Sequence, residues 1–186
     1  MTRPRRIEGY AIVSVDGMLA NAGGVMPAAL KIPGDQRFFE DGLDGVEAVA
    51  HGAHSHEQQP HSHRRRRLIL TRRIAALAPD PSNEKALFWN PAGASFAQAW
   101  AALGVLDGSL AIIGGTEVFG MFLPEYDVFY LSHAPHVRLP GGRPVFPGVP
   151  ARTPDEVLTS YRFAPDAPRL LDAAHDATVV AWRKPT

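Results

Sequence analysis

The residues of this chain that could do chemistry begin with a glycine pair at the end of an apolar run. The segment reads Leu110-Ala-Ile-Ile-Gly-Gly-Thr-Glu-Val-Phe119, and its first half has the apolar, β-branched character of a buried strand. Without a Cβ at Gly114 and Gly115, the backbone can turn sharply and lie against a ligand. Unpaired N–H groups and the dipole of a helix with Thr116 near its start favour a phosphate there. The alternative is a tight strand-to-helix turn that binds nothing.

The elements that must position this turn alternate between strand and helix. Strands are expected at 10–15, 46–51, 68–71, 109–113 and 127–133, and helices at 35–42, 95–103 and 116–123. This alternation predicts an α/β fold with a mostly parallel central sheet. Near the C-terminus, 158–163 and 177–182 are both strand-like and are joined by a long connection over 164–176. They predict an antiparallel ribbon that closes one edge of the sheet.

Length and composition limit the kinds of protein that this chain can be. Its 186 residues suit a single domain, 1–186, with a real core. Lys and Arg total 19, as do Asp and Glu, so no overall field draws the molecule to nucleic acid or anionic lipid. The absence of cysteine excludes disulfides, thiolate metal sites and cysteine nucleophiles. The apolar run 7–15 is short and contains Glu8, so it predicts a first strand and not a signal peptide. We therefore expect a soluble, cytoplasmic protein with neither a nucleic-acid nor a membrane partner.

A polar, histidine-rich segment separates two of the expected strands. Five histidines lie within thirteen positions: His51, His54, His56, His61 and His63. A zinc or nickel site is one hypothesis, but no cysteine or carboxylate framework would fix its geometry, so we expect no bound metal. The basic run from Arg64 to Arg67 has no interleaved aromatic residues, which favours a solvated loop over a nucleic-acid contact.

Three further segments complete a recognisable pattern. Ile112-Ile-Gly-Gly-Thr-Glu-Val-Phe-Gly-Met-Phe-Leu-Pro124 is followed by Asp127-Val-Phe-Tyr-Leu-Ser-His133, and Ile32-Pro-Gly-Asp-Gln-Arg-Phe-Phe39 lies upstream. From Ile7 to the C-terminus the chain resembles the dihydrofolate reductase superfamily, which also includes the reductase domain of riboflavin biosynthesis. These segments look like the Gly-Gly helix, the strand ending in Leu-Thr-His (here with serine) and the Leu-Pro-x-Asp-x-x-x-Phe motif of that superfamily. Ser14-Val-Asp-Gly17 is similar to the riboflavin branch. The resemblance implies a three-layer, dihydrofolate-reductase-like fold.

The resemblance implies that Asp35 is the catalytic carboxylate that binds the amino-pyrimidine edge of a substrate. A carboxylate accepts two parallel hydrogen bonds from a ring N–H and an exocyclic amine, and partial burial would raise its pKa. Ser132 would steady the carboxylate or the substrate through its hydroxyl group. Local sequence by itself favours the alternative that Asp35 is an ordinary helix N-cap. The implied substrate contacts are Tyr10, Leu19, Phe38, Phe39, Ile113 and Ser132.

The resemblance also implies NADPH as the cofactor. Gly52-Ala-His-Ser55 stands where the family has Gly-Arg-x-Thr at a helix start that holds phosphates, with alanine at position 53 in place of arginine. Leu68-Ile-Leu-Thr-Arg-Arg73 looks like the strand end that holds the adenosine 2′-phosphate, a task that suits the guanidinium fork of arginine. The alternative for these arginines is a solvated strand end. The implied cofactor contacts are Ile12, Gly52, Ala53, His54, Ser55, Leu70, Thr71, Arg72, Gly114, Gly115, Thr116, Glu117, Val118 and Phe119.

The implied activity is NADPH-dependent hydride transfer to dihydrofolate or a related pteridine, with protonation from water. One alternative is 5-amino-6-(5-phosphoribosylamino)uracil reduction in riboflavin biosynthesis, which Ser14-Val-Asp-Gly17 favours. A second alternative is a nucleotide-binding module with little catalysis. This alternative follows from Ala53 and from 23–30, which lacks the tryptophan usual in folate reductases. The expected partner is a small pteridine or pyrimidine, and the chain is compatible with a monomer or a homodimer.

Overall fold

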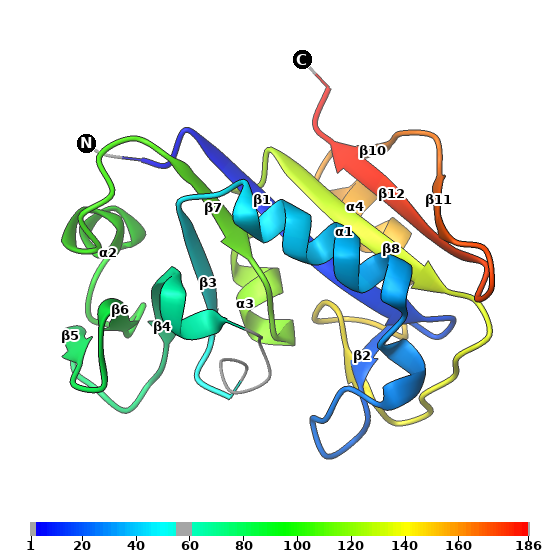
Figure 1. Ribbon diagram of the computed structural model, residues 1–186, viewed down its shortest axis with the longest axis horizontal. Coiled ribbons are helices and arrows are strands. Elements are labelled where there is room, and N and C mark those ends of the chain that lie inside the picture. The colour runs from blue at the N-terminus through cyan, green and yellow to red at the C-terminus, as the bar shows by residue number, and fades with distance from the viewer. Residues whose placement is uncertain (1–2, 55–60, 186) are drawn as a thin grey trace.

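A twisted sheet forms the centre of the computed structural model, which describes residues 3–54 and 61–185 (Figure 1). Its strands follow the order β10-β12-β8-β1-β7-β3-β4-β6-β5, with β11 paired to β12. The strands are β1 (Arg6–Ser14), β3 (Ala48–Gly52), β4 (Arg66–Leu70), β5 (Leu77–Asp80), β6 (Asn83–Trp89), β7 (Ser109–Ile112), β8 (Val128–Ala134), β10 (Ala164–Pro165), β11 (Arg169–Asp172) and β12 (Ala177–Arg183).

The centre of the sheet is parallel and its edges are antiparallel. Strands β8, β1, β7, β3, β4 and β6 all run in one direction. Strand β12 pairs with β8 in the opposite direction, as β5 does with β6. A separate two-stranded sheet joins β2 (Met18–Ala20) to β9 (Arg143–Pro144). The predicted α/β class with a mostly parallel sheet is confirmed.

Helices cover both faces of the sheet and make three layers. Helix α1 (Pro33–Asp44) lies over β1 and β8, while α3 (Thr116–Met121) and α4 (Pro154–Ser160) lie over the opposite face (Figure 1). Helix α2 (Phe96–Ala102) packs into the core of that opposite face through Trp100. The smaller cluster on the α1 face includes Tyr10, Leu43 and Val49. Apolar runs such as β7, buried along its whole length, explain why the chain forms strands that need cover on both faces.

The C-terminal ribbon exists, but one of its predicted strands is wrong. Residues 154–160 form helix α4, so 158–163 is not a strand. Thr153 caps this helix: its side chain accepts a hydrogen bond from the Glu156 N–H, and the Glu156 carboxylate accepts one from the Thr153 N–H. This capping box, with Pro154 as the first helical residue, outweighs the strand-like character of the following residues. Besides β8, strand β12 pairs with β10 and β11, and both of these lie within the predicted connection 164–176.

Candidate active site

Strands β1 and β7 separate at their carboxyl ends. Their pairing runs from Arg6↔Ser109 to Gly9↔Ile112, whereas β1 stays paired with β8 as far as Ser14↔Ala134. Beyond that point β7 follows β3, because the Ile113 N–H donates to the Ala50 carbonyl at 3.0 Å. The helices that follow β1 and β7 lie on opposite faces of the sheet (Figure 1). In open α/β sheets, ligands bind at the carboxyl ends of strands where the connections diverge in this way.

Asp35 lies beside this split, in the first turn of α1. Its side chain is buried, and the Ser132 hydroxyl of β8 donates a hydrogen bond to its carboxylate. Ser132 is paired in register with Ile12, which lies on the part of β1 that is no longer paired with β7. Asp35 therefore contacts β8, the strand next to β1, at the level of the β1–β7 separation. Burial raises the pKa of Asp35 to about 6, although the bond from Ser132 acts in the opposite direction. The N-cap of α1 is Ile32, so the alternative that Asp35 is an ordinary N-cap is wrong.

Four of the predicted substrate contacts lie together on the α1 face. Tyr10, Phe38, Phe39 and Ile113 belong to one apolar cluster, and the rings of Tyr10 and Phe39 are 6.1 Å apart. The Tyr10 ring packs against α1, since a Cβ built at Gly42 would lie 2.6 Å from its hydroxyl oxygen, and this hydroxyl donates to the Glu8 carboxylate at 2.6 Å. Leu19 lies apart from them, since it packs against the core of the opposite face.

The glycine turn after β7 is open on one side. Gly114 has φ +119°, which favours glycine, and the peptide bond to Gly115 is cis. The Gly114 carbonyl accepts a hydrogen bond from the Gly52 N–H at 2.8 Å, which joins the ends of β3 and β7. A Cβ added at Gly115 would meet no atom within 4 Å. The turn therefore has open space beside Gly115.

The residues after this turn contribute unequally to that surface. Thr116 is the first helical residue, but its hydroxyl donates to the Pro144 carbonyl instead of capping the helix. Glu117 is exposed. Val118 borders the glycines, with its Cγ2 3.7 Å from a Cβ built at Gly52. The Phe119 ring is buried in the core, 5.4 Å from the ring of Phe129, so only its backbone is left for the cofactor contact, which stays a prediction.

The ends of β3 and β4 present the other predicted cofactor residues. The Ala53 N–H donates to the Leu70 carbonyl at 3.1 Å, so this donor belongs to the sheet, and His54 is exposed. The Thr71 hydroxyl accepts a hydrogen bond from the Arg73 N–H at 3.2 Å, and the turn that results leaves Arg72 exposed at the end of β4. Ser55 lies outside the described residues. Ile12, a predicted cofactor contact, is buried in a separate apolar cluster that includes Leu30 and Ile32.

The Ser14-Val-Asp-Gly17 segment forms a hydrogen-bonded turn between β1 and β2. The Ser14 hydroxyl donates to the Asp16 carboxylate at 2.5 Å and accepts from the Met18 N–H at 3.0 Å. Asp16 also accepts from the Leu139 N–H at 3.1 Å. These contacts give the motif a structural role in this chain.

Asp172 on β11 is a residue that sequence reasoning missed. Its carboxylate accepts a hydrogen bond from the N–H of Gly34, the residue before Asp35, at 3.1 Å. The two residues are 138 positions apart in the sequence. No local pattern signals such a contact.

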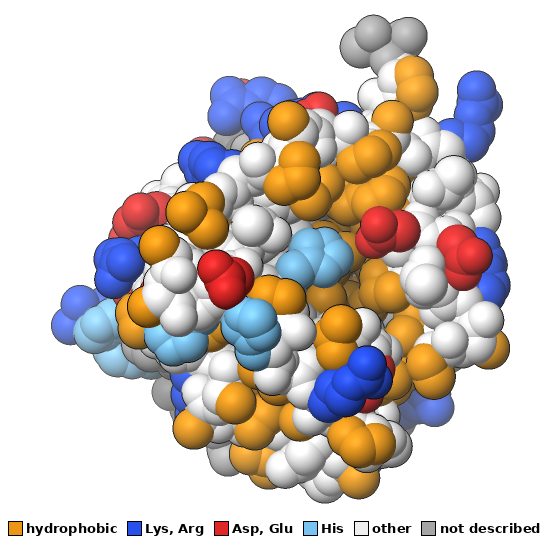
Figure 2. All heavy atoms as spheres, turned by 90° about the vertical axis from the view of Figure 1, so that its right-hand side faces the viewer, with side chains coloured by type: hydrophobic (Ala, Val, Ile, Leu, Met, Phe, Trp, Pro, Cys, Tyr) orange, Lys and Arg blue, Asp and Glu red, His pale blue; other side chains and the backbone are white. Residues whose placement is uncertain are grey.

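The side of the molecule toward which β1 and β8 run carries hydrophobic side chains, with histidine and acidic side chains among them (Figure 2). Two histidine–aspartate pairs lie at the end of β11 and in the turns that follow β8 and β11: His136–Asp176 at 2.7 Å and His175–Asp172 at 2.9 Å. Within 3–54 and 61–185, no three histidine or acidic side chains are grouped so as to hold a metal ion. His56 lies outside these ranges. In the same ranges no helix has the length and apolar character needed to cross a bilayer.

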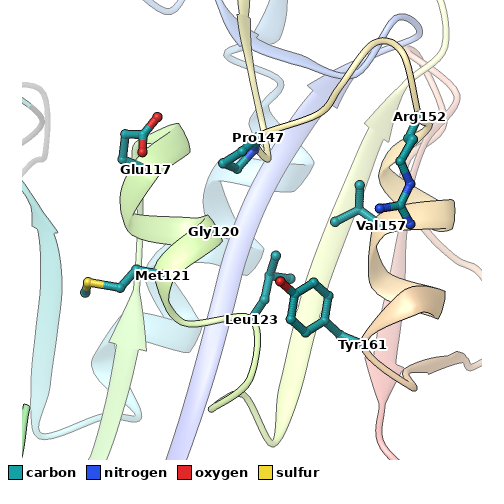
Figure 3. Close-up of a pocket in the computed structure, with 8 residues that line it drawn as sticks. All are labelled: Glu117, Gly120, Met121, Leu123, Pro147, Arg152, Val157 and Tyr161. Atoms are coloured by element: carbon teal, nitrogen blue, oxygen red, sulfur yellow. The ribbon is translucent and has the colours of Figure 1, made fainter.

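Two surface hollows lie elsewhere on the molecule. One, of about 300 Å³, separates α3 from α4 and is lined by residues such as Met121, Leu123 and Val157, with Glu117 at its rim (Figure 3). The other, of about 590 Å³, lies between the C-terminal end of α1 and the start of β4, and is lined by both acidic and basic side chains. None of the predicted substrate contacts lines either hollow.

The order of the strands, the divergent helices and the glycine turn define a dihydrofolate-reductase-like fold. Three solved structures share this fold over 97% of the chain, each with a TM-score of 0.67. Dihydrofolate reductase from Enterococcus faecalis, complexed with NADP(H) and RAB-propyl, is 18% identical and is covered over 97% of its length. A putative riboflavin biosynthesis protein from Shewanella sp. PV-4 is 16% identical and covered over 99%.

The third structure is the diaminohydroxyphosphoribosylaminopyrimidine deaminase/5-amino-6-(5-phosphoribosylamino)uracil reductase from Thermotoga maritima. It is 16% identical, and the present chain matches 56% of its length. No protein-family model matches the sequence, and no curated protein matches it. The resemblance to the superfamily is therefore confirmed at the level of the fold.

Proposed function

We propose that this protein is an NADPH-dependent reductase that acts on dihydrofolate or a related pteridine. The observation that carries the proposal is the buried carboxylate of Asp35, which receives the Ser132 hydroxyl bond beside the β1–β7 separation. A carboxylate in this position suits a heterocycle that offers a ring N–H next to an exocyclic amine. The fold shared with a dihydrofolate reductase complexed with NADP(H) supports the proposal.

The residues at the ends of β3, β4 and β7 fit the proposed cofactor. The turn that Gly52, Gly114 and Gly115 form would hold a pyrophosphate on its open side, since a Cβ at Gly115 would meet nothing within 4 Å. Arg72 stands exposed at the end of β4, where its guanidinium can pair with a 2′-phosphate. When bound, NADPH supplies the hydride that reduces a C=N or C=O carbon of the substrate.

The side chains of this protein would then bind, orient and shield the substrate. Asp35 is largely ionised above pH 6, so at neutral pH its carboxylate would accept hydrogen bonds from the substrate. This negative charge would also favour the protonated form of the substrate. Phe38, Phe39 and Ile113, which pack against one apolar cluster on the α1 face, would exclude water from the reacting ring. The proton for the adjacent nitrogen comes from water.

The proposal is tested by following the loss of NADPH absorbance with a panel of substrates. The panel contains dihydrofolate, a dihydropterin that lacks the folate tail, and 5-amino-6-(5-phosphoribosylamino)uracil. We expect turnover of a dihydropteridine and a loss of about a hundredfold in kcat/KM for Asp35→Asn, which removes the charge at the binding edge. Asp41→Asn is the matched control, because Asp41 is an exposed carboxylate on the same helix. Turnover unaffected by Asp35→Asn would contradict the role assigned to this residue.

Reduction of the riboflavin-pathway uracil is the second candidate. It is favoured by the likeness to the Shewanella and Thermotoga proteins, whose TM-scores equal that of the dihydrofolate reductase. Turnover of the uracil substrate, but of neither dihydropteridine, would decide for it. Tight NADPH binding without oxidation by any member of the panel would indicate the third possibility, a nucleotide-binding module.

A further inference from the structure

The N-terminus of α1 lacks a cap from its own sequence. Its N-cap residue, Ile32, has no side chain that can accept a hydrogen bond, and the next residue, Pro33, has no N–H. The first N–H in need of a partner is that of Gly34. It donates to Oδ2 of Asp172 at 3.1 Å, so a carboxylate on β11 supplies the cap.

The contact between α1 and β11 leaves no room for adjustment. A Cβ added at Gly34 would lie 2.1 Å from the Leu171 carbonyl oxygen and 2.8 Å from the Cβ of Asp172. The first turn of α1 therefore rests directly on the backbone of β11, which runs beside the start of the helix (Figure 1). A residue larger than glycine would force the helix and the strand apart.

The next residue in the same turn is Asp35, which is held from the other side. Its partner Ser132 lies on β8, and Ser132 is paired in register with Val179 of β12. Strand β12 also pairs with β11, through Asp172↔Ala177. The C-terminal ribbon thus fixes both supports of the turn that carries Asp35.

Asp172 is itself held in place by the turn that follows β11. Its Oδ1 accepts a hydrogen bond from the Ala174 N–H at 3.1 Å and pairs with Nδ1 of His175 at 2.9 Å. Its Oδ2 is the atom that accepts from Gly34. The bond from His175, and then that from Gly34, holds the pKa of Asp172 below its ordinary value. One oxygen is committed to the turn and the other to the helix.

We propose that Asp172 is a positioning residue for Asp35: by capping α1 through Gly34, it holds the carboxylate that binds the substrate in its buried place beside Ser132. This proposal rests on the proposed function for its catalytic meaning. Its structural content can be measured without turnover, because it concerns the environment of the Asp35 carboxyl in the protein alone.

The experiment measures the pKa of Asp35 by carbon NMR of aspartate-labelled protein, with Asp35→Asn used to assign the signal. In Asp172→Ala, water reaches the loosened turn, so the burial that raises the pKa weakens and the pKa should fall from about 6 toward 3.8. Asp172→Asn keeps an acceptor for the Gly34 N–H and should restore most of the raised pKa. Asp166→Ala is the control, since it breaks an exposed pair with Arg183 on the same ribbon.

The same variants are assayed with whichever substrate the wild-type protein reduces. Asp172→Ala should raise the KM for that substrate by roughly tenfold or more, with the KM for NADPH unchanged. An unchanged Asp35 pKa in folded Asp172→Ala would overturn the proposal. The proposal would also be overturned if the Asp35 pKa fell as far in Asp172→Asn as in Asp172→Ala, because the shift would then come from the lost charge and not from the lost cap. If Asp172→Ala does not fold, Asp172→Glu provides the test, because it keeps the charge but moves the acceptor away from the Gly34 N–H, and it should lower the Asp35 pKa. A wild-type protein without turnover would reject the proposed function, while the NMR result would still decide the positioning role.

Discussion

Replacing Asp35 by asparagine should stabilise the folded protein at neutral pH. The pKa of this carboxyl is about 6 in the folded protein, against an ordinary value of 3.8, because burial disfavours the charged form. Because this pKa is higher in the folded protein than in the unfolded chain, the neutral carboxyl contributes fully to the free energy of unfolding below pH 3.8. This contribution is lost as the pH rises through about 6. At about 1.4 kcal/mol for each pKa unit, ionisation costs the folded state about 3 kcal/mol at pH 8. Asparagine has nearly the same shape, keeps an acceptor for the Ser132 hydroxyl and has no charge to bury.

Urea unfolding of wild type and Asp35→Asn at a series of pH values measures this effect. The variant should be more stable by about 3 kcal/mol at pH 8, which corresponds to a rise in Tm of about 6–12 °C for a domain of this size. The difference should shrink as the pH falls through about 6 and should vanish below about 4. A difference that does not depend on pH, or a variant less stable than wild type at pH 8, would refute the reasoning. Asp41→Asn, at an exposed position on the same helix, should show no such difference.

Three further predictions concern the turn, the strand end and the hydroxyl group. Gly114→Ala should lower the free energy of unfolding by about 1–3 kcal/mol in chemical denaturation, because φ is +119° at this position. Gly115→Ala should fold normally, because its Cβ meets no atom within 4 Å, but it should raise the KM for NADPH in steady-state kinetics. Arg72→Ala should weaken NADPH binding by about tenfold and leave NADH binding unchanged in a titration; equal losses for both dinucleotides would contradict the 2′-phosphate contact. Ser132→Ala should raise the pKa of Asp35 above about 6, because the variant lacks the hydroxyl bond that stabilises the ionised carboxylate in the wild type. An NMR titration that finds a lower pKa would contradict this prediction.

Local sequence pattern predicted the strands that build the centre of the fold. Segment 109–113 is apolar after Ser109, and its first four residues form β7, buried at every position. Such strands are recognisable because both of their faces need apolar cover. The ribbon was less predictable, since β11 is short, carries an exposed Leu170 and shows no alternation of buried and exposed residues. By contrast, the helix start at Thr153 and Glu156 had a local signal that outweighs the strand-like residues after it.

In the candidate site, too, some features depend on neighbouring residues and could be predicted, while others depend on residues distant in the sequence. The glycine turn and the position of Asp35 near the start of a helix follow from neighbouring residues. The burial of Asp35 does not, because it depends on Ser132 of β8 and on the packing of α1 against β11. The burial of the Phe119 ring could not be predicted, because a six-residue helix shows too little periodicity to separate its ligand-facing side from its core side.

Transfer of deuterium from NADPH labelled at the reactive carbon of the nicotinamide tests the central claim most directly. After incubation with a dihydropteridine, the product of the wild-type reaction should gain a single deuterium, as detected by mass spectrometry, and Asp35→Asn should form little labelled product. Binding of NADPH with no label in any pteridine or pyrimidine product, or labelling that does not depend on Asp35, would contradict the account.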